Sequence, residues 1–140
     1  MSRILAIDYG AKRTGIAVTD SLQIIAGGLT TVSTPQLMDF LKQYIASENV
    51  ERIVFGMPMT MKGTFSENAE RTRLFIKKFT ALFPDIPVDI YDERFTSSMA
   101  HRAMIDGGIK KMARRNKALV DEISATIILQ SFMENKRNKS

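Results

Sequence analysis

The sequence predicts an α/β fold built on a mixed β-sheet, and three observations lead to this class. Short runs rich in β-branched residues occupy 4–7, 15–19 and 29–32, with glycine-containing turns between them, which is the pattern of consecutive antiparallel strands. Two more short apolar runs, at 52–56 and 88–91, follow helical patterns. Because strands that alternate with helices usually return in parallel, the later strands are expected to be parallel.

The first apolar run ends at the carboxylate of Asp8. Side chains alternate along a strand, so Asp8 is expected to share a face with Ile4 and Ala6. Leu5 and Ile7 are expected on the opposite face. An ionised carboxylate level with the core costs free energy unless a cation or hydrogen-bond donors compensate its charge. Asp8 is therefore a candidate binding residue for a cation. The structural alternative is a turn in which Asp8 accepts hydrogen bonds from nearby backbone N–H groups.

Two helices are predicted between the later strands. Thr34 is the predicted N-cap of the first helix, with Pro35 at the first helical position, and this helix is expected to end near Ser47. The second helix is expected to follow Ser66 as its N-cap. The predicted inner faces are Leu37, Phe40, Leu41, Tyr44 and Ile45 in the first helix, and Ala69, Thr72, Phe75, Ile76 and Phe79 in the second.

The last third of the chain predicts a helix ending at a glycine pair, a basic loop over 109–117 and a final helix that ends at Glu134. On this final helix Asp121 shares a face with Ala125, Ile128 and Phe132, because offsets of four, seven and eleven return to nearly the same angle. Asp121 is therefore predicted to point inward. The alternative is that first-turn N–H groups and the helix dipole hold this carboxylate.

Three acids from distant positions thus become candidates for one site: Asp8 at a strand end, Glu93 just past another strand and Asp121 near a helix start. Asp92 competes with Glu93, since adjacent strand residues face opposite ways. Converging carboxylates repel one another unless divalent cations neutralise them, and oxygen ligands without thiols suit Mg²⁺ or Mn²⁺. Two such ions could support in-line cleavage of a phosphodiester, so the pattern predicts a nuclease.

Length and composition limit the classes of protein to which the chain can belong. A chain of 140 residues with 44% hydrophobic and 25% charged residues is typical of a single globular domain, here predicted to span 1–140 with a polar tail from about 134. No apolar run approaches the ~20 residues of a membrane span, which predicts a cytoplasmic protein. The absence of cysteine excludes disulfides and thiolate metal sites. The net charge of +5 favours a polyanionic partner.

These motifs together resemble the YqgF/RuvX-type family of pre-16S rRNA nucleases, also described as Holliday junction resolvase-like. The resemblance spans essentially the whole chain. Ser124 stands where the family usually has Ala, and Thr60 and Lys62 replace a commoner Asn and Asp. The segments that carry it are 7–20, the loop residues Gly56, Pro58, Met61 and Gly63, the acidic segment 92–97, and 121–125 with 128–130.

The resemblance implies a ribonuclease H-like fold with a mixed five-stranded sheet flanked by helices, and it implies that Asp8, Glu93 and Asp121 are the metal-binding catalytic acids. It implies a hydrolase acting on pre-16S rRNA ends, with cleavage of branched DNA or non-catalytic nucleic-acid binding in transcription as alternatives. A rival class is an ATPase of the actin and sugar-kinase type, whose first hairpin also carries an Asp-x-Gly pattern. Those enzymes bind ATP between two domains, whereas the length of this chain predicts a single domain.

Basic residues near the three acids are the predicted contacts to nucleic acid. Contacts of this kind to phosphates give salt-dependent affinity without sequence readout, and the alternative for each residue is an ordinary solvated charge. The predicted residues are Lys12 and Arg13 near Asp8, Arg94 next to Glu93, and Lys110, Lys111, Arg114, Arg115 and Lys117 before the final helix.

Overall fold

The computed structural model describes residues 2–20, 22–23, 25–57, 67–92 and 124–134. All five predicted strands are present, as are both helices predicted between them, which confirms the predicted fold class. In chain order the elements are β1 (Arg3–Asp8), β2 (Arg13–Thr19), β3 (Ala26–Ser33), the 3₁₀ helix η1 (Thr34–Gln36), α1 (Leu37–Ser47), β4 (Val50–Met57), α2 (Glu67–Leu82), β5 (Val88–Asp92) and a C-terminal helix over 124–134.

The five strands form one mixed sheet in the order β3-β2-β1-β4-β5. β1 pairs antiparallel with β2, and β2 pairs antiparallel with β3. On the other side β1 pairs parallel with β4, and β4 pairs parallel with β5. The carboxyl ends of β1, β4 and β5 therefore meet at one edge of the sheet, which we call the carboxyl edge.

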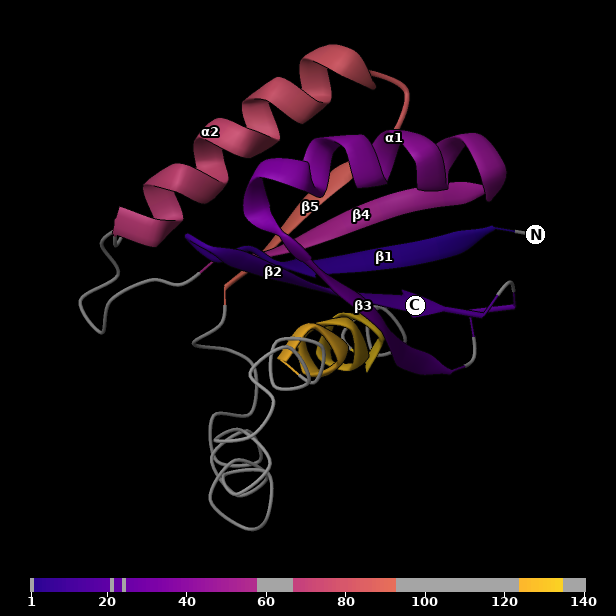
Figure 1. Cartoon of the computed structure of the whole chain (residues 1–140). Coiled ribbons are helices and arrows are strands. Elements are labelled where there is room, and N and C mark those ends of the chain that lie inside the picture. Colours follow the sequence, from indigo (N-terminus) through magenta and orange to yellow (C-terminus); the bar gives the residue numbers. More distant parts are fainter. Residues whose placement is uncertain (1, 21, 24, 58–66, 93–123, 135–140) are drawn as a thin grey trace, which may run out of the picture.

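Helices cover both faces of the sheet. Figure 1 shows α1 and α2 on one side and the C-terminal helix, in yellow, on the other. Leu5 and Ile7 of β1 belong to the core under α1 and α2, whereas Ile4 and Ala6 pack with residues of the C-terminal helix. This confirms the predicted alternation along β1. Asp8, two residues beyond Ala6, falls on the face of the C-terminal helix.

The predicted inner faces of the helices are confirmed as well. Leu37 and Leu41 of α1 are fully buried, and the other three members of that stripe pack against the same core. On α2 Phe75 and Phe79 are buried in the same core and Ile76 packs against it, while Ala69 and Thr72 are fully buried. The C-terminal helix presents Ala125 and Ile128 to the opposite core, with Phe132 packed against it. Helical spacing in the sequence was therefore enough to orient these helices.

One prediction, that Thr34 is a helix N-cap, is wrong. Ser33 occupies the N-cap position of η1 and makes no side-chain capping hydrogen bond. The Thr34 hydroxyl instead donates to the carbonyl oxygen of Gly10 at 2.6 Å, so the Thr14 hydroxyl donates to the Thr34 oxygen at 3.0 Å. The Thr34 N–H donates to the carbonyl oxygen of Lys12 at 3.0 Å. Partners brought close by tertiary folding replace the local cap, and they tie η1 to the β1–β2 hairpin.

Several predicted features lie outside the described residues. They are the Ser66 cap, the helix before the glycine pair, the basic loop over 109–117 and the start of the final helix. The predicted end of the final helix at Glu134 coincides with the last described residue of this part of the chain, so it stays a prediction. Among the described residues, no helix has the length and apolar character that crossing a membrane requires.

Candidate active site

Asp8 ends the central strand at the carboxyl edge and is partly exposed there. Its antiparallel partner on β2 is Gly15. On the other side Ile7 pairs with Phe55 of β4, so the next position level with Asp8 is Gly56. The carboxylate of Asp8 is thus flanked on both neighbouring strands by glycine.

The two glycines place no side chain of their own beside the Asp8 carboxylate. Directly opposite residues on paired strands have Cβ atoms only about 5 Å apart, so any side chain at Gly15 would stand against the Asp8 carboxylate. Gly15 and Gly56 are both buried. Sequence reasoning did not assign them this role, although glycine inside a strand is a known signal of close approach by a ligand or another backbone.

The β1–β2 hairpin places two of the predicted basic residues beside Asp8. Lys12, in the turn that connects these strands, and Arg13, the first residue of β2, are both exposed. A Cβ added to Gly10 would overlap the carbonyl oxygen of Arg13, so the tight turn requires glycine at this position. The three hydrogen bonds of Thr34 then hold the hairpin against η1. The two cations therefore project from an anchored turn.

Tyr9 follows Asp8 and belongs to the opposite layer. Its ring contacts Phe75 of α2, with the centroids 5.3 Å apart and the planes at 40°. Burial raises the pKa of the Tyr9 phenol above its usual value, while the Arg71 guanidinium acts in the opposite direction with a smaller effect. The phenol is therefore protonated at neutral pH, and Tyr9 packs against α2 at the carboxyl edge.

The structure tests the predicted site only in part. Asp8, Lys12 and Arg13 are described and lie together at one end of the sheet. The described part of β5 ends at Asp92, which is in register with Met57 of β4. Within the described residues no three histidine, aspartate or glutamate side chains form a group that could hold a metal ion. The predicted residues outside the described ranges are Glu93, Asp121, Arg94, Lys110, Lys111, Arg114, Arg115 and Lys117.

The strand order and the helical layer on each face define a ribonuclease H-like fold, with the acid Asp8 at the end of its central strand. Residues 2–135 match the family model RuvX, which is described as Holliday junction resolvase. The chain belongs to this family.

Three curated relatives illustrate the similarity, and each is named "Putative pre-16S rRNA nuclease". The chain is 62% identical to the relative from Phocaeicola vulgatus over 98% of its own length and 99% of the relative. For Bacteroides fragilis the identity is 58%, with the same coverage. For Porphyromonas gingivalis it is also 58%, over 96% of this chain and 98% of the relative. The resemblance seen in the sequence is therefore confirmed.

Among solved structures, a fowlpox virus resolvase in complex with its substrate Holliday junction DNA has the same fold. The TM-score is 0.53 at 11% sequence identity, covering 95% of this chain and 97% of the viral one. At this identity the likeness concerns the fold alone. Family and relatives together identify the chain as a nuclease, a hydrolase that acts on the ester bonds of nucleic acid.

Proposed function

We propose that this chain cleaves phosphodiester bonds of precursor 16S rRNA, using divalent cations held by Asp8, Glu93 and Asp121. The observation that carries the proposal is the position of Asp8, which ends the central strand between two glycines, on the face of the C-terminal helix. The name shared by the relatives supports the choice of rRNA as substrate.

The register of β5 supports Glu93 over Asp92 as the second acid. Val88 packs toward the core of α1 and α2, whereas Tyr91 packs against the core of the C-terminal helix. A strand that continued this alternation past Tyr91 would carry Glu93 on the face of Asp8 and Asp92 on the other face. β5 also runs parallel to β1 and ends at the same edge of the sheet.

The buried face of the C-terminal helix supports Asp121 as the third acid. Ala125 is fully buried and Ile128 nearly so, both in the core that contains Ile4 and Ala6 of β1. Asp121 is four residues before Ala125 and seven before Ile128, so in a continuous helix it extends this inner face by one turn. Asp121 would then lie on the same side of the sheet as Asp8.

Three carboxylates without thiols form a donor set of hard oxygen atoms, which fits Mg²⁺ or Mn²⁺. The glycines beside Asp8 add no side chain of their own next to this carboxylate. Such cations would activate a water molecule and stabilise the leaving oxygen of the cleaved ester. The protein's own part is to orient the carboxylates and to hold the substrate phosphates.

The basic residues around the three acids would position the nucleic-acid backbone. Lys12 and Arg13 are exposed on the anchored hairpin beside Asp8, where they can meet the phosphates next to the cleaved bond. We assign the same role to Arg94, next to Glu93. The lysines and arginines of 110–117 would hold the backbone further away from the cleaved bond.

We also propose that residues 1–140 act as a single catalytic domain. Both cores lie against the same sheet, so the described elements are built around one layer. A nuclease that acts on precursor rRNA works where ribosomes are made, so we expect a cytoplasmic protein.

Cleavage of branched DNA is the second candidate function. The description of the matching family model, Holliday junction resolvase, favours it. A resolvase must bind a four-way junction and cut it at the branch, whereas an rRNA-processing enzyme must cut RNA near the mature ends. The two functions are therefore separable by substrate.

A cleavage panel tests the proposal. The protein is incubated with Mg²⁺ or Mn²⁺ and three substrates: RNA that carries precursor ends of 16S rRNA, a four-way DNA junction and unrelated single-stranded RNA. We expect cleavage of the precursor RNA that EDTA abolishes. Cleavage of the four-way junction alone would show that branched DNA, and not precursor rRNA, is the substrate. ATP hydrolysis without cleavage of any nucleic acid would favour the ATPase class.

Gly15→Val is expected to lower kcat/KM for the precursor RNA by at least about tenfold, because the new side chain fills the space beside the Asp8 carboxylate. Because Gly15 is buried, the larger side chain must displace its neighbours, and we expect the melting temperature to fall. Cleavage rates and thermal unfolding of the variant check both statements.

The matched control is Gly27→Val on β3. A Cβ added at Gly27 meets no atom within 4 Å, so this variant changes the same residue type in the same sheet without filling the site. Equal cleavage by the two variants would show that the space beside Asp8 has no role.

A further inference from the structure

An open groove crosses the helical layer opposite the C-terminal helix. It has a volume of about 540 Å³ and lies between the start of α1 and the C-terminal half of α2. Its walls are mostly apolar: Met38 and Phe75 line it, and Leu82, which is 52% exposed, stands on one side. Lys78 is the charged residue in the lining. Such a groove can make apolar contacts with one part of a ligand and bind an anionic group of the same ligand through Lys78.

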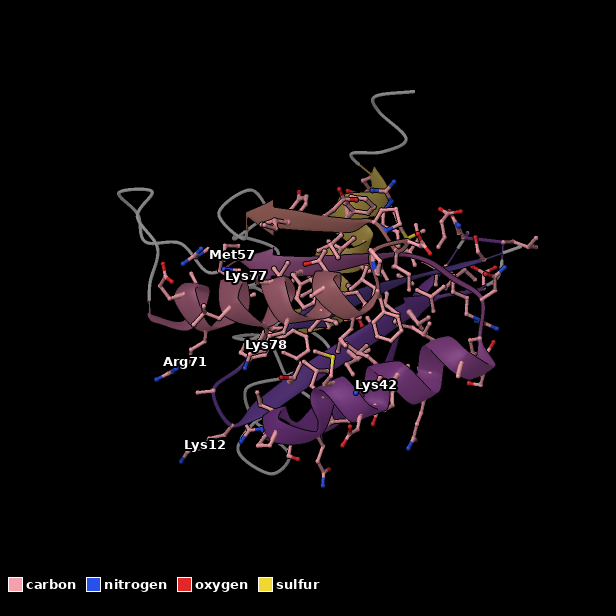
Figure 2. The ribbon with its side chains drawn as sticks, turned by 90° about the horizontal axis from the view of Figure 1, so that it is seen from above. Lys12, Lys42, Met57, Arg71, Lys77 and Lys78 are labelled. Atoms are coloured by element: carbon pink, nitrogen blue, oxygen red, sulfur yellow. The ribbon has the colours of Figure 1, made fainter. Side chains whose placement is uncertain are left out.

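The groove is continuous with the β1–β2 hairpin. Thr34 lines the groove and at the same time donates its hydroxyl to Gly10 and its N–H to the carbonyl of Lys12. Lys12, already placed beside Asp8, is therefore connected to the groove wall through one residue. Figure 2 shows Lys78 on the side of α2 that faces the hairpin, while Lys77 lies on the other side.

An aromatic contact connects the wall of the groove with the carboxyl edge. Phe75 of the groove wall contacts Tyr9, the residue after Asp8. Arg71 lies close enough to Tyr9 to act on its hydroxyl electrostatically. A nucleic-acid strand that leaves Asp8 and turns round the end of the sheet thus meets Tyr9, then Arg71, and then the groove.

Arg71 and Lys78 form a row of positive charge along this path. They are seven residues apart on α2, which is two helical turns, so they share one side of the helix about 10 Å apart. Both are exposed, as is Lys12. Among the described residues none of these three cations forms an ion pair.

We propose that this groove binds a single-stranded RNA segment next to the cleavage site, with a base against the apolar wall and phosphates at Lys78, Arg71 and Lys12. The inference rests on the proposed function, because cleavage of RNA at Asp8 requires a bound strand that can continue from Asp8 to the groove. Single-stranded nucleic acid is bound in this way, by apolar or aromatic surfaces for the bases and a cationic border for the backbone.

The shape and the charge of the groove favour this ligand over two others. A duplex hides the faces of its bases and would meet the groove with phosphates only, which leaves the apolar wall unused. An apolar peptide would use the wall but not the row of cations that leads back to Asp8. A single strand is the ligand that matches both features.

The charge is tested by Lys78→Glu with Lys77→Glu as its matched control. Lys77 is the exposed neighbour on α2 and does not line the groove, so the two variants share net charge, helix and exposure. Fluorescence anisotropy with a labelled single-stranded 12-nucleotide RNA is measured in Asp8→Asn protein, so that the RNA stays intact. We expect Lys78→Glu to raise Kd roughly tenfold and to lower the salt slope by about one, and Lys77→Glu to change Kd about twofold at most.

The apolar wall is tested by Leu82→Ser with Leu74→Ser as its control. Both leucines are on α2 and both are 52% exposed, but only Leu82 lines the groove. We expect Leu82→Ser to raise Kd about threefold or more with the salt slope unchanged, because a base loses contact area rather than a charge. Leu74→Ser should behave as the parent protein.

The outcomes separate this inference from the proposed function. If the protein cleaves the precursor RNA but both groove variants bind single-stranded RNA like their controls, the groove assignment is overturned and the proposed function stands. If a 12-base-pair RNA duplex loses as much affinity as the single strand in Lys78→Glu and Leu82→Ser, the single-strand assignment is overturned. Failure of the parent protein to bind any RNA overturns both.

Discussion

Asp8→Asn is expected to lower metal-dependent cleavage by about a thousandfold or more while leaving the fold intact. Stabilisation of transition-state charge by bound cations contributes several kcal/mol, and each 1.36 kcal/mol changes a rate tenfold. Asparagine has the same shape but lacks the negative charge that a divalent cation requires. We expect Glu93→Gln and Asp121→Asn to have the same effect. Cleavage rates of the three variants on the precursor RNA are the measurement.

A readout independent of cleavage is the thermal shift caused by Mn²⁺. A ligand that binds only the folded state raises the melting temperature, so Mn²⁺ should stabilise the parent protein and should do so much less in each variant. Asp85→Asn is the control, because Asp85 is an exposed acid in the turn before β5, at the opposite edge of the sheet. Full activity in any of the three variants would remove that acid from the site. A manganese-soaked crystal with the three acids in separate regions would refute the shared site.

Phe79→Ala is expected to have the largest effect on stability, a loss of about 3–5 kcal/mol in the free energy of unfolding. Phe79 is fully buried at the centre of the core under α1 and α2. Its ring lies 6.5 Å from that of Phe55 and 5.0 Å from that of Phe83, so truncation leaves a cavity that rigid strands and helices cannot close. We expect the melting temperature to fall by roughly 10 °C or more.

Leu74→Ala is the matched control for this stability prediction. Leu74 is on the same helix and is 52% exposed, so its truncation is expected to cost less than about 0.5 kcal/mol. Thermal and urea unfolding measure both variants. A loss below about 1 kcal/mol for Phe79→Ala would mean that this core repacks around the missing ring. Cleavage well below the melting temperature should be retained, since Phe79 lies away from the acid-bearing face.

Local patterns in the sequence predicted the parts of the fold that depend on a single period. Alternation along β1 separated Leu5 and Ile7 from Ile4 and Ala6, and both sets lie in the cores that this predicts. Helical spacing likewise predicted the buried stripes. The N-cap at Thr34 failed, because the hydroxyl found partners in a hairpin more than twenty residues away, and no local pattern reports a contact of that kind.

For the candidate site, the sequence predicts residues but not their neighbours. An acid after a buried strand is visible in the sequence, and so is a cluster of cations near it. The role of Gly15 was not visible, since it depends on which residue of β2 stands opposite Asp8. The groove between α1 and α2 was not visible either, because its walls come from two helices that sequence patterns orient but do not place side by side.

The sequence by itself determined the class of fold and the faces of its helices and strands, because each depends on the spacing of residue types along a short stretch. It also supplies the acidic and basic residues from which the site is proposed. Only the tertiary structure decided what stands next to what: the strand order that puts β1 between β2 and β4, the glycines beside Asp8 and the groove that leads away from it. The physical reason is that side chains distant in the sequence become neighbours only when sheet register and helix packing bring them together.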